Sequence, residues 1–277
     1  MNYVKTENQI IIYELEDFNI KQILDCGQIF RYNINEDNAV VYSKDKKADI
    51  KTEKDKVIIT SDDIDYFENF FDLSTDYSLI KNTLKKDIFL KDAVGYGYGI
   101  RILKNDLYEM IISFIISANN NISRIKKSIN CLCEKFGTRC KDYYAFPTLK
   151  QLKKASVEDY KIAGLGYRAE QMFETVQFLT EKHIKDLQNL NKQEQFNFLV
   201  SLKGVGEKVA NCVMLFGLGV KDAFPVDTWI NKVYNKITNS CETDRKKITK
   251  ELTAKYGELS GYAQQYFFYY FRDKKID

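Results

Sequence analysis

A lysine and an aspartate nineteen positions apart carry the clearest chemical potential in this chain. Lys208 stands near the start of a helical pattern, and Asp227 follows Pro225 where a further helix is expected to begin. An amine whose pKa is lowered by partial burial can attack a sugar anomeric carbon and form a Schiff base. A nearby carboxylate would stabilise the positive charge that develops as a base departs. The alternatives are a solvent-facing helix lysine and a purely structural helix cap.

The turn before Lys208 has the composition of a phosphate site. Residues 198–202 and 207–212 have the spacing of two amphipathic helices, joined through Gly204 and Gly206. These glycines permit a tight, positive-φ turn and let a phosphate approach the backbone, while the second helix begins with free N–H groups and the positive end of its dipole. Such a helix–hairpin–helix can hold a DNA backbone without reading bases. An ordinary helix–helix turn is the competing interpretation.

The elements that must position these residues fall into two parts. Up to about residue 60, β-type runs predict antiparallel strands at 9–13, 28–34, 39–43 and 56–60. From Ile64 onward the spacing is helical, with helices expected at 105–117, 121–136, 148–154, 167–182, 193–202, 207–217, 228–238, 244–256 and 260–271. We therefore predict an α+β fold. An N-terminal antiparallel β-sheet domain with flanking helices, residues 1–100, packs on an all-helical domain, residues 101–277, with a cleft between them.

Composition restricts the class of protein. The chain has 277 residues, 44% of them hydrophobic, and only two prolines, which indicates an ordered core without a long linker. Its first 100 residues carry a net charge of −6 and the remainder +9, so the C-terminal part is expected to face a polyanion. No apolar stretch is long enough to span a bilayer, and the N-terminus lacks a secretory signal. We expect a cytoplasmic protein, nucleoid-associated if prokaryotic, without a membrane partner.

The six cysteines favour reduced thiols over a disulfide framework or a metal cluster. Cys131, Cys133 and Cys140 lie close together in sequence, but the only histidine, His183, is far from them. A zinc or iron–sulfur site would need a fourth ligand at workable spacing. The sequence therefore predicts helical core thiols.

Several motifs in the same order resemble one known family. The Leu-x-Gly-Val-Gly-x-Lys-Val-Ala hairpin at 202–210, followed by Pro-Val-Asp at 225–227, resembles the helix–hairpin–helix/Gly-Pro-Asp superfamily of DNA glycosylases. Within that superfamily the chain resembles the 8-oxoguanine DNA glycosylases. Three further segments agree: Cys-Gly-Gln-Ile-Phe-Arg at 26–31, Ser-Ala-Asn-Asn-Asn-Ile-Ser-Arg at 117–124, and Gly-Leu-Gly-Tyr-Arg-Ala at 164–169. The resemblance covers most of the chain.

The resemblance implies a bifunctional enzyme of base excision repair, a DNA glycosylase with AP lyase activity that removes 8-oxoguanine from duplex DNA. Lys208 would be the nucleophile that displaces the damaged base and then supports β-elimination of the strand, and Asp227 its electrostatic partner. No organic cofactor is implied. A cation often bridges the hairpin and a DNA phosphate in this superfamily, which here would involve main-chain carbonyls of Val200, Leu202 and Val205.

The resemblance also assigns residues to a pocket for the flipped base. The Gly27 carbonyl would accept a hydrogen bond from N7–H, a donor that 8-oxoguanine has and guanine lacks. Cys212 and Phe268 would sandwich the base, and Gln264 would reach its Watson–Crick edge. Without the family, Cys212, Phe268 and Gln264 fit a core thiol, a core aromatic and a surface amide.

Four positions would contact the duplex left behind by base flipping. By resemblance, Asn119 enters the vacated space, Tyr167 wedges beside the partner base, and Arg124 and Arg168 donate hydrogen bonds to the cytosine opposite the lesion. A polar loop and arginines that contact only phosphates are the alternatives. The expected partner is double-stranded DNA containing 8-oxoguanine, bound by a monomer.

The chain departs from the family pattern at two places. Trp229 stands where eukaryotic members usually carry a histidine near the 5′ phosphate, so that contact must be absent or made differently. The final cysteine is Cys241, so the four-cysteine iron–sulfur loop of endonuclease III relatives is missing and no iron–sulfur cluster is expected. A glycosylase for another damaged base and a non-catalytic helix–hairpin–helix DNA-binding protein remain the alternatives.

Overall fold

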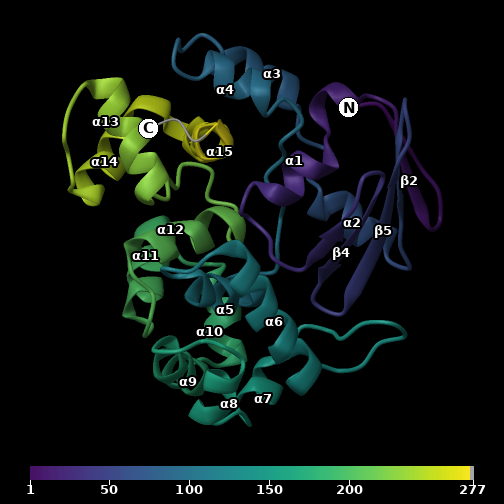
Figure 1. Ribbon diagram of the computed structural model, residues 1–277, viewed down its shortest axis with the longest axis vertical. Coiled ribbons are helices and arrows are strands. Elements are labelled where there is room, and N and C mark those ends of the chain that lie inside the picture. Colours follow the sequence, from purple (N-terminus) through teal and green to yellow (C-terminus); the bar gives the residue numbers. More distant parts are fainter. Residues whose placement is uncertain (275–277) are drawn as a thin grey trace.

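The computed structural model describes residues 1–274 and contains one antiparallel sheet on one side of the molecule, with helices filling the rest (Figure 1). The last three residues of the predicted second domain lie outside the described residues. The strands pair in the order β1-β2-β6-β5-β4-β3. Their bounds are β1 Tyr3–Lys5, β2 Gln9–Ile12, β3 Tyr32–Ile34, β4 Asn38–Ser43, β5 Lys46–Thr52 and β6 Val57–Thr60.

The sheet forms because alternate side chains on neighbouring strands are apolar and point to one face. Ile10, Val41 and Ile59 are fully buried on that face, which packs against the phenylalanines of α2, Ile64–Phe70. The predicted strands near 9–13, 39–43 and 56–60 are confirmed. Two strands, β1 and β5, were not predicted, because β1 has only three residues and β5 is rich in charged side chains.

Fourteen further α-helices of the described chain make up the rest of the molecule. Before residue 100 they are α1 Ile20–Asp25, α3 Tyr77–Leu84 and α4 Lys91–Tyr96. The middle of the chain contains α5 Leu107–Ser117, α6 Ile122–Phe136, α7 Leu149–Leu152, α8 Val157–Ile162, α9 Arg168–Phe178 and α10 Glu181–Leu187. The remainder contains α11 Lys192–Ser201, α12 Glu207–Phe216, α13 Thr228–Thr238, α14 Arg245–Tyr256 and α15 Ser260–Lys274. The predicted α+β class is therefore confirmed.

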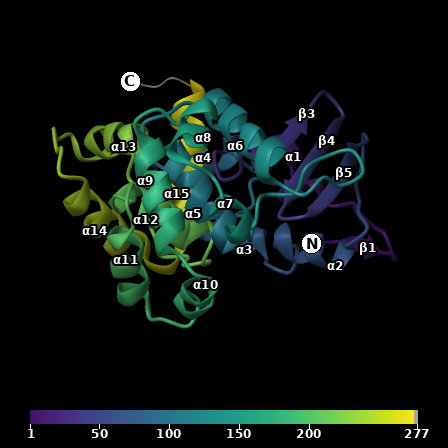
Figure 2. The same cartoon turned by 90° about the horizontal axis from the view of Figure 1, so that it is seen from below.

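These helices enclose two apolar cores. The first surrounds α5, ten of whose residues are buried, and includes side chains of α6, α9 and α12. The second joins α3 and α4 to α13, α14 and α15, which lie across the upper part of Figure 1 and are seen from below in Figure 2. Helices from both sides of residue 100 thus share one core, while the predicted division at that residue stays a prediction.

One predicted helix is two. The pattern at 167–182 covers α9 and the start of α10, with a break where the Thr180 hydroxyl caps α10 by accepting a hydrogen bond from the His183 amide at 3.0 Å. The preceding helix ends because Leu179, its C-cap, and Thr180 both have extended backbone angles. The short α8 was also not predicted.

No helix within residues 1–274 is both long enough and apolar enough to cross a membrane.

Candidate active site

The α11–α12 hairpin contains two glycines with different backbone conformations. Gly204 has a φ of +79°, and a side chain there would come within 3.1 Å of the Gln171 amide oxygen. Gly206, by contrast, has a φ of −88° and caps α12. A Cβ at Gly206 would have no neighbour within 4 Å, so its backbone lies open to an approaching phosphate. The predicted positive-φ turn therefore depends on Gly204 alone.

Lys208 and Asp227 line the same cavity although different helices carry them. Lys208 is half-buried in the first turn of α12, and its Nζ lies 5.4 Å from the centre of the Phe114 ring. Asp227 caps α13, as predicted, because its Oδ1 accepts a hydrogen bond from the Ile230 amide at 2.9 Å. Its Oδ2 has no donor among the described residues, so it can face a developing positive charge.

The four residues predicted to hold a flipped base line this cavity too: Gly27, Cys212, Gln264 and Phe268. Their convergence brings together the end of α1, the middle of α12 and the C-terminal helix α15. The cavity has a volume of about 50 Å³. By this measure one water molecule needs about 10–15 Å³, so the cavity holds only a few waters. We therefore expect its walls to move when a purine enters.

The ring of Phe268 accounts for part of the narrowness. A Cβ added to Gly27, whose φ is +79°, would lie 3.0 Å from Cε1 of Phe268, so the ring packs directly on the glycine backbone. The floor is formed by Phe114 and Phe216, whose rings stack at 5.6 Å. Neither floor residue was predicted, since apolar helix positions carry no signal that separates a pocket wall from a core.

Two polar side chains in the cavity are nearly excluded from water. Burial raises the pKa of the Cys212 thiol and the neighbouring Lys208 ammonium opposes that rise, so the thiol is neutral near pH 7. Gln264 is 4% exposed, and its Oε1 has no hydrogen-bond partner in the described chain. A buried acceptor without a donor costs about 1–3 kcal/mol, which a ligand with a matching donor would recover.

The residues predicted to face the duplex lie on two loops and at the starts of the helices that follow them, α6 and α9. Asn119 and Arg124 are exposed, as is Tyr167, which is 63% exposed. Arg168 is only 5% exposed and points inward, where it donates hydrogen bonds to the carbonyls of Ala118 at 2.6 Å and Asn119 at 2.8 Å. In the free protein Arg168 thus holds the loop that carries Asn119, and its predicted contact with a cytosine stays a prediction.

Trp229 occupies the first turn of α13 and is half-buried. The Lys232 Nζ lies 5.3 Å from the centre of its ring, in cation–π range. An indole beside an ammonium therefore stands where the family pattern has a histidine.

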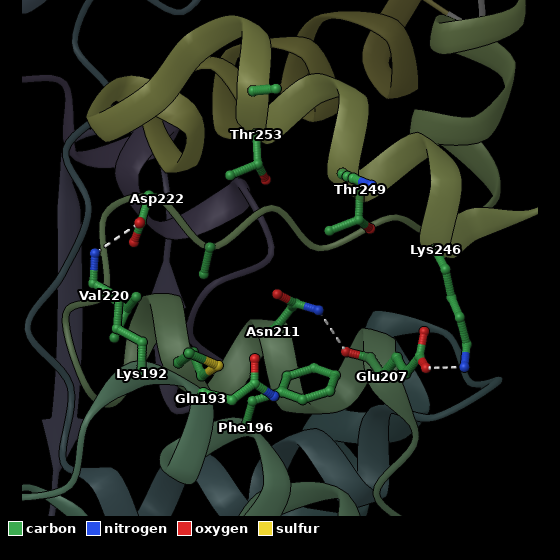
Figure 3. A pocket seen from close by; sticks show the side chains of 14 residues that line it. Lys192, Gln193, Phe196, Glu207, Asn211, Val220, Asp222, Lys246, Thr249 and Thr253 are labelled. Atoms are coloured by element: carbon green, nitrogen blue, oxygen red, sulfur yellow. Dashed lines mark hydrogen bonds and ion pairs between the residues drawn. The ribbon is translucent and has the colours of Figure 1, made fainter.

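A wider groove between α11, α12 and α14 does not contain the predicted catalytic pair (Figure 3). Its volume is about 590 Å³. Ion pairs of 2.7 Å join Lys192 to Asp222 and Lys246 to Glu207 at its edges (Figure 3). The convergence of a lysine, a carboxylate and an unpartnered amide, rather than cavity size, identifies the candidate site.

Comparison with protein families agrees with the convergence of these motifs. Residues 112–258 match the model described as HhH-GPD superfamily base excision DNA repair protein. The chain belongs to the HhH-GPD superfamily. Residues 10–111 match the 8-oxoguanine DNA glycosylase N-terminal domain, so this HhH-GPD protein also has the accessory part of that branch. The resemblance found in the sequence is thereby confirmed.

Individual relatives of this HhH-GPD protein have consistent names. The N-glycosylase/DNA lyase OGG1 of Arabidopsis thaliana is 33% identical over 66% of this chain and 55% of its own length. A probable N-glycosylase/DNA lyase of Methanothermobacter thermautotrophicus is 30% identical over 73% of this chain and 72% of its own. The matched segment is thus about half the length of the plant relative.

A solved structure is similar over almost the whole fold. The Clostridium acetobutylicum 8-oxoguanine glycosylase/lyase, in complex with dsDNA containing cytosine opposite to 8-oxoG, superposes with a TM-score of 0.94. It is 36% identical, and the match covers 100% of this chain and 99% of that one.

Proposed function

We propose that this chain is a bifunctional glycosylase and AP lyase that removes 8-oxoguanine from duplex DNA. The observation that carries the proposal is the shared cavity of Lys208, Asp227, Gly27 and Gln264, drawn from four distant segments. The printed names of its relatives, N-glycosylase/DNA lyase and 8-oxoguanine glycosylase/lyase, support the same chemistry.

Lys208 supplies the nucleophile. Its deprotonated amine attacks C1′ of the flipped nucleoside, the C1′–N9 bond breaks, and the electron pair leaves with the base, which takes up a proton. The bound amine loses its proton and the sugar ring opens to give a Schiff base. Loss of a C2′ proton then expels the 3′ phosphate. Asp227 stabilises the positive charge at C1′ through the carboxylate oxygen that its capping bond leaves unused.

The cavity distinguishes the lesion by its hydrogen bonds. The Gly27 carbonyl has no donor among residues 1–274 and accepts N7–H of 8-oxoguanine. Guanine lacks that proton and would leave the acceptor unpaired, at a cost of about 1–3 kcal/mol. Gln264 forms hydrogen bonds with the Watson–Crick edge of the base. The Phe268 ring moves away from Gly27, and the base then lies between this ring and Cys212.

The remaining contacts hold the duplex from which the base has been flipped. Asn119 fills the gap, Tyr167 wedges beside the partner base, and Arg124 donates to the opposite cytosine. Arg168 contacts the same cytosine by giving up its hydrogen bond to the Ala118 or the Asn119 carbonyl and donating to the base instead. We propose that a monomer does this in the cytoplasm, near the nucleoid if the source is prokaryotic, without an organic cofactor or an iron–sulfur cluster.

A cation at the hairpin would strengthen the phosphate contact. The last carbonyls of a helix lack intrahelical donors. At the end of α11 the Leu202 carbonyl accepts one hydrogen bond, from the Val205 amide at 3.1 Å. The Val200 carbonyl accepts none from the backbone of the described loop that follows α11. Oxygen donors of this kind suit a hard cation. We propose that the carbonyls of Val200, Leu202 and Val205 hold it there, as a structural rather than a catalytic group.

Borohydride trapping tests the proposed chemistry directly. The wild-type chain is expected to form a covalent band on duplexes with one 8-oxoguanine opposite cytosine, and none on undamaged guanine. Lys208→Gln should abolish the band, whereas Lys203→Gln, an exposed lysine of the same hairpin, should keep it. A duplex series with each of the four opposite bases tests Arg124 and Arg168. Absence of any lesion-dependent band with the wild type would refute the proposal.

A further inference from the structure

We propose that Gln265 and Arg272, on α15, are positioning residues that fix the Gly27 turn and thereby set the discrimination between 8-oxoguanine and guanine. This inference rests on the proposed function. Neither residue belongs to the motifs that the sequence analysis singled out as functional, and both contact the turn from a point some 240 residues further along the chain.

The turn is held from the α15 side through two successive carbonyls. Helix α1 ends at Asp25, and its last carbonyls have no intrahelical donors. Arg272 Nη1 donates to the Asp25 carbonyl at 2.6 Å, and Gln265 Nε2 donates to the Cys26 carbonyl at 3.3 Å. The next carbonyl, that of Gly27, is the first without a donor in the described chain. The two side chains therefore leave one acceptor of the turn for the ligand.

The opposite side of the turn is fixed by Gln28, which is fully buried. Its Nε2 donates to the Ile23 carbonyl at 3.0 Å and to the Arg101 carbonyl at 2.7 Å, and its Oε1 accepts the Leu103 amide at 2.8 Å. Gly27 thus lies between two sets of hydrogen bonds. Its position then depends on α15 on one side and, through Gln28, on α1 and the segment at 101–103 on the other.

Arg272 also contacts the facing wall of the cavity. Its guanidinium carbon lies 5.2 Å from the centre of the Phe268 ring, and Asp273 pairs with its other nitrogens at 2.7 and 3.0 Å. The side chain of Arg272 is 19% exposed, so these contacts are largely shielded from water. Arg272 therefore contacts both the Phe268 ring, which must move for a base to enter, and the Gly27 turn, which must stay in place.

This arrangement predicts which reaction depends on the two residues. Excision of 8-oxoguanine needs the Gly27 carbonyl at hydrogen-bond distance from N7–H, and a misplacement of about 1 Å can cost 10²-fold in rate. Cleavage at a preformed abasic site needs Lys208 but no base in the cavity. A purely structural role would lower both activities together, whereas a positioning role lowers excision selectively.

The experiment compares Gln265→Met and Arg272→Met with the wild type in single-turnover assays on two duplexes, one with 8-oxoguanine and one with an abasic site, each opposite cytosine. Excision is expected to fall about 10- to 100-fold and abasic cleavage to stay within about twofold. Arg272→Lys, which retains a donor, should recover part of the loss. Gln193→Met, on the exposed face of α11, is the matched control and should change neither activity.

Melting temperatures separate unfolding from mispositioning. Equal losses in both activities, or no loss in excision, would overturn the inference. If Gln265→Met unfolds, Arg272→Met still tests it, because Arg272 lies near the end of α15. A wild type that cleaves neither duplex would instead refute the proposed function, so the two failures are distinguishable.

Discussion

The base cavity and the duplex-facing loops of this molecule are built in opposite ways. The cavity takes its residues from four segments far apart in sequence, and buried hydrogen bonds hold each segment in place. The loops at 118–121 and 164–167 carry exposed side chains such as Asn119 and Tyr167, and the buried Arg168 holds the first loop through the Ala118 and Asn119 carbonyls. The residues proposed to recognise the lesion are therefore already held in place in the free protein, whereas those proposed to contact the duplex gain their partners only when DNA binds.

The same difference appears in backbone strain. Gly27, in the cavity, has a left-handed φ of +79° at no steric cost because it lacks a side chain. Asn119, on the loop, has a φ of +46° and pays for it, although asparagine tolerates this region better than most residues. The Arg168 bond to the Asn119 carbonyl offsets that cost in the free protein. The cavity thus uses a glycine, and the duplex-facing loop an asparagine, for a similar left-handed backbone conformation.

Asp227→Asn should produce the largest effect, confined to the cavity. Asparagine caps a helix as well as aspartate does, so the bond to the Ile230 amide and the fold should persist. The lost charge should lower single-turnover excision by about 10²- to 10³-fold. Asp244→Asn, at the cap of α14, is the matched control and should leave excision unchanged. Equal rates for Asp227→Asn and the wild type would remove Asp227 from the mechanism.

Gly27→Ala should produce the next largest effect. Alanine at a φ of +79° costs about 1–2 kcal/mol, and its Cβ would press on Phe268 at 3.0 Å. Excision should fall about tenfold or more, since the carbonyl shifts from N7–H. Gly219→Ala shares the positive φ, at +70°, but has no neighbour within 4 Å. Calorimetry should show similar destabilisation for both variants, with the excision defect in Gly27→Ala alone.

The sequence predicts the catalytic pair and the hairpin because their signals are local. A glycine turn, a proline before an aspartate and the apolar spacing of α12 are all readable within thirty residues. Helix α1 was not predicted, and residues 28–31 were wrongly assigned to a strand, since their apolar run resembles one. In the fold, the buried Gln28 holds that run against the end of α1.

Contacts between distant segments could not be predicted. The bond from Gln265 to the Cys26 carbonyl joins positions 239 apart, and nothing near either residue indicates it. The direction of Arg168 was also beyond sequence reasoning, because an arginine after a glycine turn can face DNA or the backbone equally well. Family resemblance places such residues near a site, but the hydrogen-bond partners come from the folded chain.

Arg124→Ala and Arg168→Ala should separate two roles, recognition of the opposite base and support of the loop at 118–121. Arg124 is exposed, and the hydrogen bond that it donates to Asn121 Oδ1 comes from its backbone amide and does not involve the side chain, so Arg124→Ala should leave the melting temperature unchanged. Preference for cytosine over adenine opposite the lesion should fall about fivefold, near the lower limit for one base contact. Arg168→Ala should also lower stability, since it leaves buried carbonyls unpaired. Excision rates opposite both bases, with melting curves, measure this, and equal melting temperatures for the two variants would contradict it.

Gly206→Ala should have the smallest effect. Gly206 has open space around it and a φ of −88°, so alanine fits without steric strain, and only its poorer capping of α12 should lower the melting temperature slightly. Its methyl group would, however, keep a phosphate from the α12 amides, and the loss of one hydrogen bond corresponds to about 0.5–1.5 kcal/mol of binding.

The salt dependence of binding identifies the cause of that loss. An amide contact neutralises no phosphate charge with a cation, so Gly206→Ala should weaken duplex binding by a similar factor at every salt concentration. Lys203→Gln removes a cation from the same hairpin and, if Lys203 contacts a phosphate, should reduce the slope of log K against log salt by about 1. A reduced slope for Gly206→Ala would mean that the glycine acts by placing a lysine, and the hairpin would then hold DNA by charge rather than by its backbone.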